Sequence, residues 1–116
     1  MRFSAPLLDL SQARAIAPDA AQLQALVRSF DDSLATERAR MDRAVTEGQA
    51  EALQWGLHAL KGFMAMFCQP ALAQAVTELY AASRQQPLDA TLRAYTELAP
   101  VLADLQTEVR AWLGAL

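Results

Sequence analysis

The chain has 116 residues, which is enough for one domain with its own core and too few for two domains of ordinary size. Hydrophobic residues make up 53% and charged residues 20%, so the composition excludes a disordered chain. The formal net charge is -3 at pH 7, and the arginines are scattered rather than gathered in a patch. Nucleic acid and an anionic membrane are therefore not expected as partners.

The single cysteine, Cys68, excludes an internal disulfide and fits a reducing compartment, so we expect a cytoplasmic protein. The first residues contain no apolar run long enough for a signal peptide. The longest run without charge, residues 62–77, is interrupted by Gln69 and Pro70 and falls short of the ~20 residues that a membrane span needs. No membrane anchor is expected.

The apolar residues recur at helical spacing, and the sequence predicts five helices with no strand. The expected helices span about residues 9–17, 19–47, 49–68, 70–86 and 88–114. Asp9 or Ser11 can cap the first helix, which Pro18 ends. Gly48 supplies a stop for the second helix, and Pro70 starts the fourth. The apolar face of the fourth helix carries Leu72, Val76, Leu79 and Tyr80.

The four longer helices are joined by short connections, so consecutive helices are expected to run antiparallel. This arrangement predicts an all-α fold, an up-and-down four-helix bundle with a short extra N-terminal helix. Residues 1–116 are expected to form a single domain, and we expect that domain to be a monomer.

The only histidine of the chain, His58, and the only lysine, Lys61, lie one turn apart in the third predicted helix, followed by Gly62. Side chains on a helix lean toward its N-terminus, so a side chain at position 62 would lie over the imidazole. Glycine leaves that space open, at a cost of roughly 1 kcal/mol of helix stability relative to alanine. We interpret Gly62 as clearance for a large partner.

The apolar stripe of this helix faces away from the histidine. It consists of Leu53, Leu57, Leu60, Met64 and Phe67. At about 100° per residue its centre lies roughly 140° from His58, which predicts an exposed imidazole. The neighbours of His58 on the helical wheel include Gln54, Trp55, Ala65 and Met66. We interpret these four residues as a partner-binding surface; packing of Trp55 and Met66 beneath the leading helix is the alternative.

The residues available for chemistry exclude several kinds of site. No serine is spaced to pair with His58, and Cys68 lies far along the helix, so a hydrolase is not expected. A zinc site needs three or four Cys or His ligands and the chain holds two in total, so no metal is expected. No Gly-rich phosphate loop or dinucleotide fingerprint is present, so neither ATP nor another cofactor is expected.

The imidazole itself remains as a nucleophile. A histidine with its ordinary pKa of about 6.5 is largely neutral at cellular pH, so a ring nitrogen can attack an electrophilic phosphorus. The resulting phosphoryl group needs a neighbouring cation, and Lys61 can supply it.

Residues 57–62 read Leu-His-Ala-Leu-Lys-Gly, which resembles the signature of histidine-containing phosphotransfer (Hpt) domains, and the resemblance extends over roughly residues 8–113. It implies that His58 takes a phosphoryl group from a receiver-domain aspartate and passes it to another receiver. By the same matching, Lys61 is the phosphoryl-side cation and Gly62 the clearance position. The implied partners are response-regulator receiver domains and a hybrid sensor histidine kinase. The chain would be a phosphorelay intermediate rather than an enzyme, with no autokinase or ATP site.

The alternative function is a non-catalytic helical adaptor that binds a receiver or kinase without taking a phosphoryl group. The intact combination of His58, Lys61 and Gly62 argues against such a degenerate module.

Overall fold

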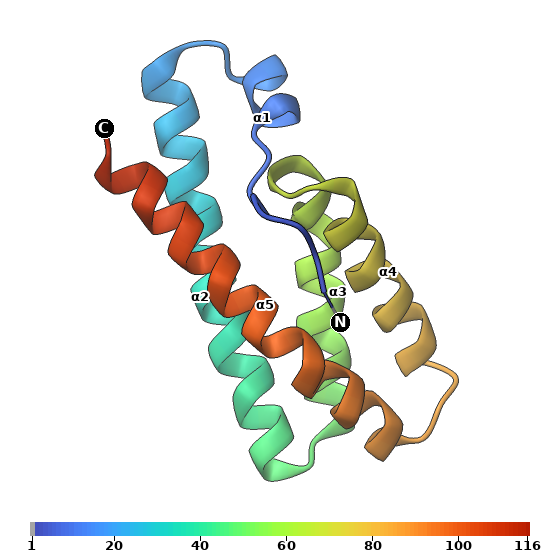
Figure 1. The fold of residues 1–116 in the computed structure, drawn as a ribbon. Helices are drawn as coiled ribbons and strands as arrows, with labels where there is room; N and C mark the ends of the chain where they lie inside the picture. The colour runs from blue at the N-terminus through green and yellow to red at the C-terminus, as the bar shows by residue number, and fades with distance from the viewer. Residues whose placement is uncertain (1) are drawn as a thin grey trace.

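The structure, a computed structural model, describes residues 2–116 and consists of helices joined by short connections (Figure 1). Their bounds are α1 Ser11–Ile16, α2 Ala20–Glu47, α3 Ala50–Phe67, α4 Pro70–Ser83 and α5 Leu88–Gly114. No strand forms within residues 2–116, which confirms the all-α prediction. The long helices α2 to α5 alternate in direction along the bundle (Figure 1). None of the described helices is long and apolar enough to cross a membrane.

Local sequence signals explain where the long helices begin and end. The Asp19 carboxylate accepts hydrogen bonds from the amides of Ala21 and Gln22, at 2.9 and 3.1 Å, and so caps α2. Gly48 ends α2 with φ of 65°, in the left-handed region that glycine adopts without strain. Pro70 occupies the first turn of α4, where the missing amide hydrogen costs no intrahelical hydrogen bond.

Two helix boundaries differ from the sequence-based expectation. The first helix begins only at Ser11, because Asp9 folds a turn ahead of it and accepts hydrogen bonds from the Ser11 amide and hydroxyl, at 3.0 and 2.7 Å. The fourth helix ends at Ser83 instead of near Gln86, and residues 84–87 connect it to α5. This earlier end places Arg84 just beyond α4 instead of within it.

The core lies between α3 and its neighbours, because α3 packs against both α2 and α4 while α5 packs against α2 and α4. The predicted apolar stripe is buried in full; it comprises Leu53, Leu57, Leu60, Met64 and Phe67. Phe30 of α2 stacks on Phe67 with ring centroids 4.3 Å apart. A methyl group at Gly56 would collide with the Met41 side chain, so this glycine permits the close approach of α2 and α3.

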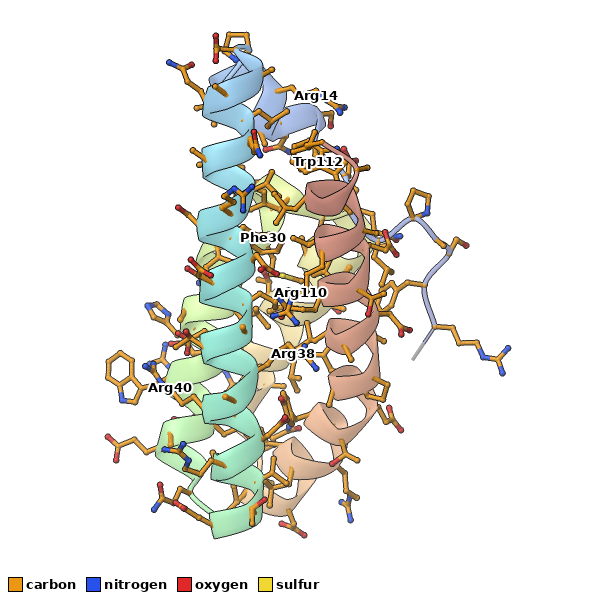
Figure 2. The ribbon with its side chains drawn as sticks, turned by 90° about the vertical axis from the view of Figure 1, so that its left-hand side faces the viewer. Arg14, Phe30, Arg38, Arg40, Arg110 and Trp112 are labelled. Atoms are coloured by element: carbon orange, nitrogen blue, oxygen red, sulfur yellow. The ribbon has the colours of Figure 1, made fainter. Side chains whose placement is uncertain are left out.

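The contact between α2 and α5 contains a polar seam. Gln106 is buried there, donates to the Asp31 carbonyl at 3.0 Å and accepts from the Arg38 guanidinium at 3.3 Å. Arg110 pairs with the Asp31 carboxylate at 3.3 Å. Figure 2 shows Arg38 and Arg110 between these two helices. Because a buried amide without partners is costly, these hydrogen bonds favour one register of α5 against α2.

The segment before α1 crosses the turn between α3 and α4. The Glu108 carboxylate of α5 accepts hydrogen bonds from the amides of Leu7 and Leu8, at 2.9 and 3.0 Å. The Gln69 amide donates to the Leu7 carbonyl at 2.9 Å. Cys68 is buried beside this segment, and burial raises the pKa of its thiol to about 12. Cys68 is therefore a small apolar core residue, not a reactive thiol.

Candidate functional site

His58 lies in the middle of α3 with its side chain exposed, and Lys61 is half-buried one turn further along. Gly62 is exposed as well. A methyl group built at Gly62 would meet no atom of residues 2–116 within 4 Å outside its own turn of helix. The space over the imidazole is therefore open, and it is bordered on one side by a cation.

The neighbouring helix contributes an aromatic ring to this site. The Tyr80 ring of α4 lies 5.2 Å from the His58 ring, centroid to centroid, at an interplanar angle of 48°. The Lys61 ammonium nitrogen lies 5.1 Å from the centroid of the Tyr80 ring, within the range of a cation–π interaction. The sequence places Tyr80 on the core face with Leu79, but it is half-buried and sits at the edge of that face, beside the histidine.

Two shallow hollows meet at this edge of the bundle. One has a volume of about 240 Å³ and borders His58; its lining residues are Glu51, Gln54, Trp55, His58, Tyr80 and Arg84. The other has a volume of about 440 Å³ and includes Lys61, Tyr80 and Arg84 in its wall. Tyr80 and Arg84 are common to both hollows. A second cation, Arg84, thus lies on the same side of the bundle as the exposed imidazole.

Comparison with known proteins assigns the chain to a family. The model of the Hpt domain family matches residues 25–112, which run from α2 to α5 and include His58. The chain belongs to the Hpt domain family. Hpt domains are phosphocarrier modules that perform histidine phosphotransfer in two-component phosphorelays, where they interact with receiver domains and kinases. No curated protein and no solved structure matches the chain.

The exposed surface beside His58 in this Hpt domain is partly apolar. Trp55 is 61% exposed, and its ring lies 6.1 Å from the His58 ring at an interplanar angle of 83°. This exposure excludes the alternative in which Trp55 packs beneath the leading helix. Ala65 is exposed, whereas Met66 is half-buried and packs against the core.

Gln54 differs from the other residues of this surface because its amide is engaged within the Hpt domain. Its side-chain nitrogen donates a hydrogen bond to the Ser83 carbonyl at 2.7 Å, which joins α3 to the last residue of α4. The helical wheel identifies Gln54 as a neighbour of His58, but it carries no information about a partner on another helix.

The arrangement around His58 offers a nucleophile and two cations, Lys61 and Arg84. Within residues 2–116 no three His, Cys, Asp or Glu side chains gather in a way that would hold a metal ion. An exposed imidazole with cations on the same side of the bundle has the chemical means to attack an electrophile and to stabilise the negative charge that develops on it.

Proposed function

We propose that His58 is the phosphorylated residue of this Hpt domain. It accepts a phosphoryl group from the aspartate of one receiver domain and passes it to the aspartate of another. The observation that carries this proposal is the geometry of the only histidine: it is exposed at mid-helix, with Lys61 one turn away and open space over Gly62. A receiver must bring its aspartyl phosphate within about 3–3.5 Å of the attacking nitrogen, and an open surface permits that approach.

The transfer is a direct displacement at phosphorus. One ring nitrogen of the neutral imidazole attacks the phosphorus of the acyl phosphate and forms a P–N bond. The P–O bond to the aspartate breaks, and its electron pair stays on the carboxylate that leaves. Lys61 and Arg84 stabilise the charge on the phosphoryl oxygens during the transfer. The same steps in reverse, with a second receiver, return the histidine to its starting form.

The receiver docks on the surface around His58 that is formed by Trp55, Ala65 and Met66, with Gln54 at its margin. The exposure of Trp55 supports this part of the proposal, because a large exposed aromatic side chain beside the reacting group is suited to burial in an interface. With the net charge of -3, affinity for the acidic pocket expected in a receiver rests on apolar contact instead of long-range attraction.

We also propose where the domain acts and in which oligomeric state. The domain acts in the cytoplasm, where receiver domains are encountered, and it acts as a monomer. A sedimentation-equilibrium mass near 12.6 kDa at micromolar concentration supports the monomer, and a mass twice as large contradicts it.

The proposal is tested by transfer of ³²P from phosphorylated receiver domains of the source organism, each in turn. The parent protein is expected to take up label that is acid-labile and base-stable, as a phosphohistidine is. His58→Gln is expected to keep the helical circular dichroism spectrum of the parent and to take up no label. Label that persists in His58→Gln contradicts the assignment. Binding of a receiver without any label in the parent would instead establish the non-catalytic adaptor.

A further inference from the structure

The end of α4 is tied to α3 by a side chain. Ser83 is the last residue of α4, and carbonyl groups in the last turn of a helix lack intrahelical partners. The following amides turn back to earlier carbonyls: those of Arg84 and Gln85 bond to Ala81 and Ala82. The Ser83 carbonyl receives its hydrogen bond from Gln54 of α3, at 2.7 Å.

The same turn of α4 carries the ring that contacts the site. The Ser83 hydroxyl is buried and donates to the Tyr80 carbonyl at 2.6 Å. The Tyr80 ring in turn lies against both His58 and Lys61, at 5.2 and 5.1 Å. Contacts therefore connect Gln54 of α3 to Ser83 at the end of α4. They continue from Ser83 to Tyr80, whose ring contacts His58 of α3.

The spacing along α3 makes this set of contacts compact. Gln54 and His58 are four residues apart, so they occupy the same face of α3 on successive turns. Tyr80 and Ser83 are three residues apart and occupy one face of α4. Loss of the Gln54 hydrogen bond would remove the protein partner of a carbonyl in the last turn of α4 and the side-chain hydrogen bond that joins this turn to α3.

We propose that Gln54 is a positioning residue for phosphotransfer and that it acts through Tyr80. By holding the last turn of α4, Gln54 keeps the Tyr80 ring against His58 and keeps the Lys61 ammonium over that ring. The imidazole and the cation then stay in a fixed relation when the phosphoryl group arrives. This inference rests on the proposal that His58 is the phosphorylated residue.

The test uses Gln54→Met, which keeps the length of the side chain and removes its hydrogen-bond donor. At saturating phosphorylated receiver, we expect the transfer rate to fall roughly tenfold, less than the ~100-fold that a 1 Å misplacement can cost. Because Gln54 lies only at the margin of the docking surface, the receiver concentration at half-saturation is expected to change much less than the maximal rate. A rise in that concentration with an unchanged maximal rate would show that Gln54 only contacts the receiver, and would overturn the inference.

A double-mutant cycle tests whether Gln54 acts through Tyr80. Tyr80→Leu alone is expected to slow transfer to a similar extent, and the double variant is expected to be no slower than Tyr80→Leu. Rate losses that multiply in the double variant would contradict the inference. The His58 ring proton resonances give an independent measurement, because the neighbouring Tyr80 ring shifts them. Gln54→Met is expected to move them toward their positions in Tyr80→Leu, and unchanged positions would refute the inference.

The matched control is Gln106→Met, the same substitution at another glutamine that joins two helices. Gln106 lies in the seam between α2 and α5, so its loss is expected to lower the thermal midpoint and leave the transfer rate of the folded protein unchanged. Should Gln54→Met fail to fold, Gln54→Asn, whose donor is one methylene shorter, is measured in its place. If the parent takes no label from any receiver, the proposed function fails, whereas the His58 resonances still decide whether Gln54 holds Tyr80.

Discussion

Gly62 offers a test in which stability and function are expected to change in opposite directions. Glycine in a helix interior costs about 1 kcal/mol relative to alanine, and leucine is nearly as favourable as alanine. Because the space around Gly62 is open, a methyl group there meets no neighbouring side chain in the free protein. We therefore expect Gly62→Ala and Gly62→Leu each to raise the free energy of unfolding by about 0.8 kcal/mol. For a domain of this size that corresponds to a thermal midpoint roughly 3 °C higher.

The effect on transfer is the reverse. A leucine at position 62 leans back along α3 toward His58 and occupies the space through which a receiver approaches. We expect transfer to Gly62→Leu to be at least about tenfold slower than to the parent, with Gly62→Ala in between, since a near-attack approach tolerates little intrusion. The increase in stability excludes partial unfolding as the cause of the lower rate.

The matched control is Gly56→Ala, the same substitution in the same helix where space is lacking. Its methyl group would collide with the buried Met41, and overpacking of this kind costs about 1–3 kcal/mol, against about 1 kcal/mol gained in helix propensity. The net expectation is no gain or a loss of up to about 2 kcal/mol. Urea denaturation followed by circular dichroism measures all three variants, and single-turnover ³²P transfer measures their rates. Gly62→Leu accepting label at the parent rate would refute the clearance argument, and a destabilised Gly62→Ala would refute the claim of open space.

Two further predictions concern Trp55 and Cys68. Because the Trp55 ring is exposed, Trp55→Ala is expected to change the free energy of unfolding by no more than about 0.5 kcal/mol. The same variant is expected to weaken receiver binding by about 2 kcal/mol, measured by isothermal titration calorimetry. An unchanged affinity for the receiver would contradict the proposed docking surface. Because burial raises the pKa of the Cys68 thiol from 9.0 to about 12, the unfolded chain loses this proton first as pH rises. Between pH 9 and 12, Cys68 should therefore reduce the free energy of unfolding by up to about 1.4 kcal/mol per pH unit. The stability advantage of the parent over Cys68→Ala should shrink accordingly in urea titrations at pH 8 and pH 10, and an advantage that stays constant would contradict the assignment.

The helices were predictable because their signals are local. Asp19, Gly48 and Pro70 each fix a helix boundary through their own backbone or side-chain chemistry. The 3.6-residue period of the apolar positions in α3 likewise identifies its buried face, and this period alone predicts an exposed His58.

The parts of the site that the sequence did not reveal depend on contacts between helices. A helical period assigns Tyr80 to the apolar side of α4, but whether such a residue lies at the centre or the edge of that side depends on where α3 crosses it. The end of α4 at Ser83 is supported by the hydrogen bond from Gln54, which lies 29 positions earlier in the sequence. Arg84 follows Tyr80 by four positions and has a helical backbone, so it lies on the same face as Tyr80. It was missed because the sequence did not identify Tyr80 as a neighbour of His58.

The Glu108 carboxylate holds the segment before α1 against the bundle, and this contact affects how much of the chain folds as one cooperative unit. The family match begins at residue 25, yet Leu7, Leu10, Ala13 and Ala17 are buried and belong to the core. Each fully buried leucine contributes about 1.5–3 kcal/mol, and a whole domain is typically stable by only about 5–15 kcal/mol. A fragment trimmed to residues 25–112 would lose those side chains, expose the junction of α3 and α4 to water and leave the Glu108 carboxylate without its two amide donors. The family match thus covers the four long helices, whereas in this protein we expect the autonomous folding unit to extend upstream and include the leading segment.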